Sequence, residues 1–223
     1  MTEELRKRIL TSLVILPLSI FFILKGGYFL LFFLLSIFFV ANYELFSVFN
    51  KKATILLLDL ILILSLYSIY YLADHAALLY LLLWVIILVI CSDVGGYVSG
   101  KIFKWKKLTR ISPKKTLSGV LGSFVFSLFS VFIANAILPK ATATFIPIAS
   151  LINFLEPKFF FLAIILSLVA QTGDLTISYF KRIEKIKDTG KILPGHGGIL
   201  DRIDGLMFVV IVAFILIQIN IIP

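Results

Sequence analysis

The densest group of chemically useful side chains lies between Ser178 and Gly205, in the sequence SYFKRIEKIKDTGKILPGHGGILDRIDG. Asp201 and Asp204 are three residues apart, so both carboxylates face nearly the same side of a helix. Such oxygens bind Mg²⁺ together with the phosphate groups of a substrate. Arg202 lies between them, and His196 adds a proton donor or carrier. The segment therefore favours metal-assisted chemistry on a phosphate.

The same segment also carries groups that suit an anion. Gly197 and Gly198 let backbone amides approach a phosphate without a Cβ atom in the way, and Pro194 restricts the backbone before them. Lysine and arginine at this density suit a polyphosphate, and the basic residues are Lys181, Arg182, Lys185, Lys187 and Lys191. Charge alone would fit a solvated loop beside a membrane better.

Asp174 lies in AQTGDLTIS, with Gln171 and Ser178 at i−3 and i+4 on the same helix face. Three oxygen-bearing side chains on one face suit a hard cation or a phosphate. A network of hydrogen bonds between helices is the alternative.

Asp93 lies in CSDVGGYVSGK, where three glycines permit close approach of a ligand or of another helix. An acidic side chain within an apolar helix costs about 2.5–3.5 kcal/mol on insertion scales, so each one needs a partner or a function. Two further acids, Glu44 and Asp59, are near Lys51 and Lys52, and we expect them to pair locally at the membrane interface.

A second basic stretch, RISPKKTLSG, directly precedes an apolar run. Its hydroxyl and ammonium groups favour a triphosphate or lipid phosphate, and they come from Ser112, Lys114, Lys115 and Thr116. By itself the stretch would also fit contact with anionic lipids.

These residues must be positioned by membrane helices. The 223 residues are 61% hydrophobic, with a mean hydropathy of +1.10, which excludes a soluble globular chain and a disordered one. Unbroken apolar runs also argue against the alternating strands of a membrane β-barrel. Seven runs are predicted as membrane-spanning helices: Ile9 to Leu24, Tyr28 to Phe49, Thr54 to Ala73, Ala76 to Ser99, Leu117 to Leu138, Phe159 to Phe180 and Gly205 to Ile222. The first is interpreted as a retained span rather than a signal peptide.

The distribution of basic residues predicts the orientation. With a cytoplasmic N-terminus, 18 of the 21 Lys and Arg residues lie in the four cytoplasmic segments, and the exceptions are Lys25, Lys140 and Lys158. The formal charge of +9 therefore does not indicate a nucleic acid partner. Thr144 to Leu155 is short and contains Pro147, so it is expected to be interfacial or re-entrant. We predict one polytopic membrane domain over residues 1–223, with scaffold helices in 1–75 and catalytic helices in 76–223, forming a polar cavity that faces the cytoplasm.

The stretch from Ser178 to Asp204 resembles the signature of the phosphatidate cytidylyltransferases, also called CDP-diacylglycerol synthases. The matching elements follow in order: Ser178, Lys181–Arg182, Lys187–Asp188, Gly190, Pro194, His196–Gly197–Gly198, Asp201–Arg202 and Asp204. SDVGGYVSGK, SPKKT and the GDL ending at Leu175 resemble the family as well. One departure is Ile177, where members usually have a glutamate, and the role of that carboxylate does not carry over.

The resemblance implies transfer of a cytidylyl group from CTP to phosphatidate, with Mg²⁺, at the cytoplasmic face of a bacterial cytoplasmic membrane. Asp174 and Asp201 would bridge the metal, and Asp93 and Asp204 would complete or orient its shell; a second cation is left open. His196 would orient Asp201 or donate to pyrophosphate. Phosphates would be bound by Lys181 and Arg202, and by the substrate-binding set Ser112, Lys114, Lys115, Thr116, Ser178, Arg182, Lys187, Gly197 and Gly198. A homodimer is also implied.

Two other functions compete. A CDP-alcohol phosphotransferase would need paired D-G-x-x-A-R and G-x-x-x-D-x-x-x-D motifs, which the sequence lacks. A transporter of an anionic or cation-coupled solute would explain Asp93 and Asp174, but it predicts repeats and polar groups on both sides of the midplane. The polar groups here are concentrated in the second half of the chain.

Overall fold

The computed structural model describes residues 3–109, 111–142, 152–190, 192, 195 and 197–221. Over these residues the fold consists of seven helices and no strands, apart from an isolated bridge between Lys107 and Thr116. The helices are α1 (Glu3–Lys25), α2 (Gly27–Val48), α3 (Lys52–Asp74), α4 (Ala76–Phe103), α5 (Leu117–Thr142), α6 (Pro157–Ile183) and α7 (Leu200–Gln218). Each of the seven predicted apolar runs overlaps one of these helices, so the all-α prediction is confirmed.

The last helix extends beyond the predicted membrane span. The span was predicted from Gly205, and α7 begins at Leu200, so it includes Asp201, Arg202 and Asp204, as the helical spacing of the two aspartates predicted. No side chain of its own caps this end, and the residues that satisfy it come from elsewhere in the chain. The predicted interfacial stretch Thr144 to Leu155 lies mostly outside the described residues.

Five helices are long and apolar enough to cross a membrane: Gly27–Val48, Lys52–Asp74, Ala77–Phe103, Leu117–Leu138 and Pro157–Ile183. The chain is therefore a multi-pass membrane protein. The apolar part of α1 is shorter and covers Leu13–Lys25. In α7, three of the first five residues are charged. Seven crossings therefore stay a prediction.

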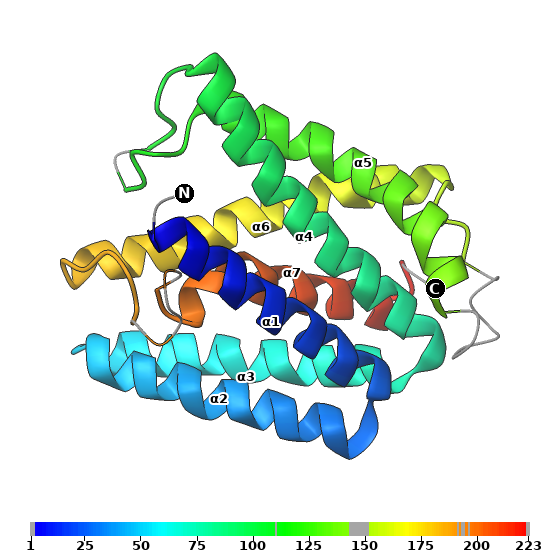
Figure 1. Ribbon diagram of the computed structural model, residues 1–223, viewed down its shortest axis with the longest axis horizontal. Helices are drawn as coiled ribbons and strands as arrows, with labels where there is room; N and C mark the ends of the chain where they lie inside the picture. Colours follow the sequence, from blue (N-terminus) through cyan, green and yellow to red (C-terminus); the bar gives the residue numbers. More distant parts are fainter. Residues whose placement is uncertain are drawn as a thin grey trace.

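The tightest helix pair is α4 with α5, which Figure 1 shows running side by side. A Cβ atom on Gly122 of α5 would lie 2.5 Å from the carbonyl oxygen of Gly95 in α4. Ser123 of α5 also donates a hydrogen bond of 2.8 Å to the carbonyl oxygen of Ser92. The glycines of CSDVGGYVSGK were predicted to permit close approach of a ligand or of another helix, and the structure shows close approach of another helix.

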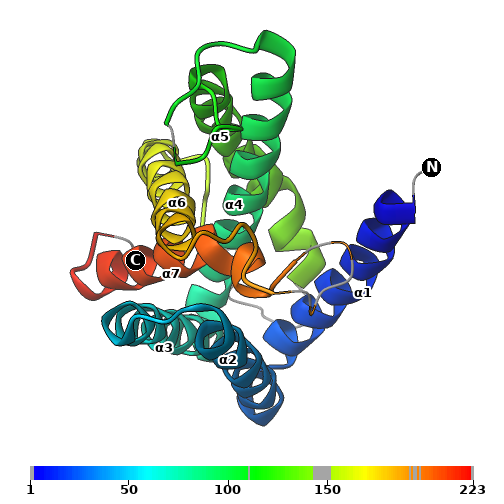
Figure 2. The same ribbon diagram turned by 90° about the vertical axis from the view of Figure 1, so that its left-hand side faces the viewer.

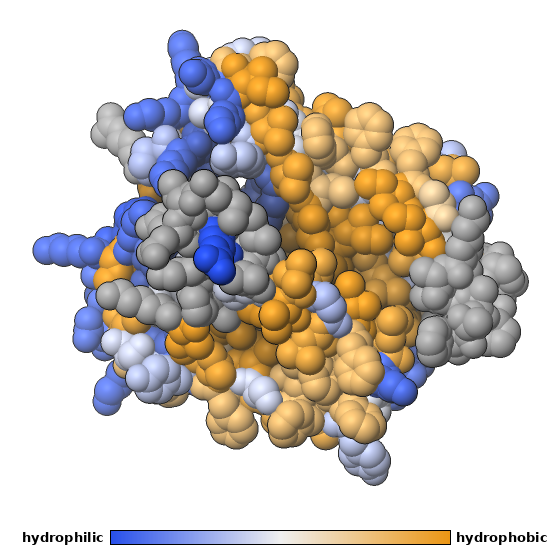
Figure 3. Space-filling model, in the orientation of Figure 1, coloured by the Kyte–Doolittle hydropathy of each residue, from blue (hydrophilic) through white to orange (hydrophobic). Residues whose placement is uncertain are grey.

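Figure 2 shows the remaining helices around this pair, with α6 and α7 beside α4, with α2 and α3 below, and with α1 to one side. The start of α1, the turn between α2 and α3, and the connections between α4 and α5 and between α6 and α7 all lie toward one end of the molecule (Figure 1). Hydrophilic surface gathers at that end, and most of the remaining visible surface is hydrophobic (Figure 3). The four segments predicted to share one side of the membrane thus lie together.

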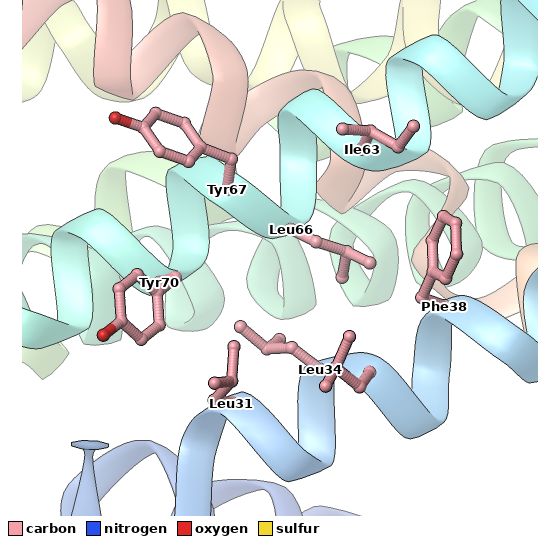
Figure 4. Close-up of a pocket in the computed structure, with 8 residues that line it drawn as sticks. Leu31, Leu34, Phe38, Ile63, Leu66, Tyr67 and Tyr70 are labelled. Atoms are coloured by element: carbon pink, nitrogen blue, oxygen red, sulfur yellow. The ribbon is translucent and has the colours of Figure 1, made fainter. Parts of the chain in front are cut away.

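A groove of about 330 Å³ lies between α2 and α3 (Figure 4). Its lining is aliphatic and aromatic: Leu31, Leu34, Leu35, Phe38, Ile63, Leu66, Tyr67 and Tyr70. Because no charged side chain lines it, this groove does not suit a phosphate, and the functional site must be sought at the hydrophilic end.

Candidate functional site

Asp201 lies at the centre of a buried network in the first turn of α7. Its Oδ1 atom is 2.8 Å from the Nζ atom of Lys181, near the end of α6, and the two side chains are only 5% and 9% exposed. Its Oδ2 atom accepts hydrogen bonds from the backbone N–H groups of Thr189, at 2.8 Å, and Gly198, at 3.0 Å. Asp201 therefore links two points of the α6–α7 connection, Thr189 and Gly198, to Lys181 of α6.

Asp174 forms a second centre on α6. Its Oδ2 atom is 2.6 Å from the Nζ atom of Lys115, and its Oδ1 atom accepts a hydrogen bond of 3.2 Å from Ser178. Lys115 also donates to the carbonyl oxygen of Gln171. The predicted shared face of Asp174 and Ser178 is confirmed. The structure also brings Lys115 of the SPKKT stretch to this face. The Gln171 amide instead points to Ser167 within α6.

The other two predicted carboxylates belong to the same electrostatic environment. Asp93 on α4 interacts with Asp174, Lys115 and Arg202, and Asp204 on α7 interacts with Asp174, Lys181 and Asp93. Carboxylates from three helices therefore lie in one region, and basic groups from three elements surround them.

The two basic connections are tied to each other. Arg182 donates from Nε to the carbonyl oxygen of Ile111, at 3.2 Å, and from Nη1 to that of Ile186, at 2.7 Å. Its guanidinium therefore holds the two loops together in this structure. Lys114 and Lys187 are exposed, and phosphate binding by these three residues stays a prediction.

Other predicted substrate-binding residues have local structural contacts. Thr116 accepts a hydrogen bond from the N–H of Gly119 and so caps α5. The N–H of Ser112 donates to Thr109. A Cβ atom on Gly197, whose φ is +86°, would lie 2.9 Å from Oδ2 of Asp201, so this glycine packs on the carboxylate. His196 and Pro194 lie outside the described residues.

Glu44 was expected to pair with Lys51 or Lys52, and this prediction is wrong. The residue is 1% exposed, and its carboxylate accepts hydrogen bonds from the N–H groups of Ile199, at 2.9 Å, and Leu200, at 3.1 Å. A helix N-terminus offers unpaired donors and a favourable dipole, whereas a pair with an exposed lysine is weakened by solvent. The signal in the sequence was the acid itself, placed in an apolar run.

Asp59 has no such partner. Its Oδ1 atom is buried without a hydrogen bond, and no described ion pair joins it to Lys51 or Lys52.

The donor set fits a magnesium ion that is bound together with a substrate. In the described part of the chain, no three Asp, Glu, His or Cys side chains are arranged to enclose a metal. Mg²⁺ usually takes one or two carboxylates and completes its octahedron with water and substrate phosphates, so a closed cage is not needed. Both carboxylates already have partners in the protein, but Asp174 is 34% exposed and so accessible to an ion, whereas Asp201 is only 5% exposed.

Comparison with known proteins shows the family of the chain. A model described as the cytidylyltransferase family matches residues 47–220. The chain belongs to the cytidylyltransferase family. Members named phosphatidate cytidylyltransferase include one from Helicobacter pylori, 38% identical over 127 residues. Others come from Rickettsia conorii, 38% identical over 141 residues, and Staphylococcus haemolyticus, 39% identical over 141 residues.

These matches cover 57%, 60% and 63% of this chain, and 43%, 57% and 50% of the three relatives in the same order. The chain thus spans about half the length of the curated cytidylyltransferases that it matches.

Proposed function

We propose that this protein transfers the cytidylyl group of CTP to phosphatidate, forming CDP-diacylglycerol and pyrophosphate. The observation that carries the proposal is the convergence of two lysine–aspartate pairs at the hydrophilic end, Lys115 with Asp174 and Lys181 with Asp201. The names of the bacterial relatives support the choice of CTP and phosphatidate.

In the proposed reaction a lipid phosphate oxygen attacks the α-phosphorus of CTP. A new P–O bond forms as the bond to the β-phosphate oxygen breaks, and pyrophosphate leaves with that electron pair. No covalent intermediate on the protein is needed, so the protein contributes positioning and charge. Lys115 and Arg202 would bind phosphate oxygens, and Lys181 would keep Asp201 and the α6–α7 connection in place.

Asp174, Asp204 and Asp93 would hold Mg²⁺, whose bound charge would neutralise the triphosphate. Asp201 would join them only if its pair with Lys181 opened. The apolar helices and the bacterial relatives support a place in a bacterial cytoplasmic membrane, with the hydrophilic end facing the cytoplasm, and the family likeness supports a homodimer.

Purified protein in detergent micelles tests the lipid substrate. With CTP and Mg²⁺, phosphatidate should give CDP-diacylglycerol by mass spectrometry, and diacylglycerol with the same acyl chains should give none, because it lacks the attacking phosphate. Asp174→Asn should lower turnover by about tenfold to a hundredfold or more, the scale of lost metal-site contacts, while Asp59→Asn should not. Product from diacylglycerol, or none from either lipid, would refute the proposal.

A further inference from the structure

We propose that Glu44 of α2 is a positioning residue that holds Thr189 and the start of α7 in the geometry the reaction needs. Two experiments test this proposal. The first measures kcat and so rests on the proposed function, and the second measures hydrogen exchange and does not. Glu44 lies before the first residue of the family match, at position 47, and no motif of the signature includes it.

The carboxylate of Glu44 caps α7 from a different helix. Besides the N–H groups of Ile199 and Leu200, it accepts a hydrogen bond of 3.3 Å from the hydroxyl of Thr189. The two amides are the first donors of α7, and α7 has no capping side chain of its own. A buried negative charge at this end also complements the positive end of the helix dipole.

The same segment is held from its other side by Asp201. Thr189 donates its hydroxyl to Glu44 and its backbone N–H to Asp201. Gly198 donates its N–H to Asp201, and the next two N–H groups donate to Glu44. The two carboxylates thus share the donors of Thr189 and of residues 198–200 between them, so a shift of either moves the start of α7, which carries Asp201, Arg202 and Asp204.

Two signature glycines make room for Glu44. A Cβ atom on Gly190 would lie 2.7 Å from Oε1 of Glu44, and the next two atoms it would meet also belong to Glu44. A Cβ atom on Gly198 would lie 2.6 Å from Oε2. These glycines therefore leave space for a carboxylate of the protein itself, whereas the sequence alone suggested a phosphate beside Gly198.

A second hydrogen bond joins the end of α2 to the connection between α6 and α7. Asn50, in the turn after α2, donates a hydrogen bond of 3.0 Å to Glu184, which directly follows α6. The α2 helix thus contributes to the site itself, and its role exceeds that of apolar scaffold.

A double-mutant cycle tests the contact between Gly190 and Glu44. Gly190→Ala should lower kcat on the order of tenfold, because the new methyl group displaces the carboxylate. Glu44→Ala should lower kcat to a similar extent and change KM less. In the Glu44→Ala background, Gly190→Ala should have little further effect. Asp59→Asn, the matched loss of a carboxylate in the same half of the chain, should leave kcat unchanged. Additive losses in the double variant would overturn the proposal.

Hydrogen exchange gives a readout that needs no activity. In Glu44→Gln, peptides covering 197–202 should exchange on the order of tenfold faster, because charge-assisted hydrogen bonds to the first amides of α7 are weakened. Asp59→Asn should exchange like the parent chain. Unchanged exchange in Glu44→Gln would overturn the inference even if the enzyme is active, and accelerated exchange in a chain without cytidylyltransferase activity would refute only the proposed function.

Discussion

At the scale of single residues, the two lysine–aspartate pairs differ in burial, and burial decides their roles. The Lys181–Asp201 pair is 9% and 5% exposed, and the Lys115–Asp174 pair is 24% and 34% exposed. Breaking a buried pair leaves an uncompensated charge and costs about 3–5 kcal/mol, whereas exposed pairs contribute about 0–1 kcal/mol. Removing one partner of the first pair should therefore destabilise the site, whereas the second pair, if the proposed function holds, would exchange its contacts with substrate.

Asp201→Asn should lower the free energy of unfolding by about 3 kcal/mol, because the buried Lys181 ammonium loses its counter-charge. Lys181→Met should cost a similar amount, since it leaves the carboxylate unpaired. The double variant should lose clearly less than the two added together. Titration with SDS in mixed micelles measures these values.

Lys187→Met, an exposed lysine on the same connection, is the control and should change stability by less than about 0.5 kcal/mol. Strictly additive losses for Asp201→Asn and Lys181→Met would contradict a buried ion pair.

At the scale of the elements, the sequence predicted each helix because an apolar run of this length has few other options in lipid. The sequence also predicted that the signature aspartates and lysines belong to one site. It did not predict the bond between Glu44 and Ile199, which are 155 positions apart. Nothing local distinguishes a buried acid that caps a distant helix from one that pairs with the next lysine, and so the role of Glu44 was predicted wrongly.

Packing of α4 on α5 allows a prediction at this scale. Gly122→Ala should destabilise the protein by about 1–3 kcal/mol, because the new methyl group forces the two helices apart. Leu121→Ala, its 51% exposed neighbour on α5, should cost less, because it faces away from α4. Thermal unfolding in detergent compares the two, and an equal loss in both variants would show that the close approach of α4 and α5 contributes little.

At the scale of the whole molecule, the fold places its basic connections at one hydrophilic end. The α2–α3 turn and the two long connections lie there together (Figures 1 and 3). This arrangement gathers positive charge at one end, as a site for the anionic substrates of the proposed reaction would require.

The positive-inside pattern predicts that this end faces the cytoplasm. With Cys91 replaced by serine, a membrane-impermeant maleimide should label Lys25→Cys in intact spheroplasts. It should label Lys106→Cys only after the membrane is permeabilised. The opposite pattern would reverse the orientation.

The most direct test of the central claim follows both ends of the triphosphate. Protein in micelles with phosphatidate and Mg²⁺ receives CTP labelled with ³²P at either the α- or the γ-position. We expect the α-label to enter the organic phase as CDP-diacylglycerol, and the γ-label to stay in the aqueous phase as pyrophosphate, in equal amounts. Organic γ-label, or γ-label released without lipid-bound α-label, would mean that the protein does not transfer a cytidylyl group to phosphatidate.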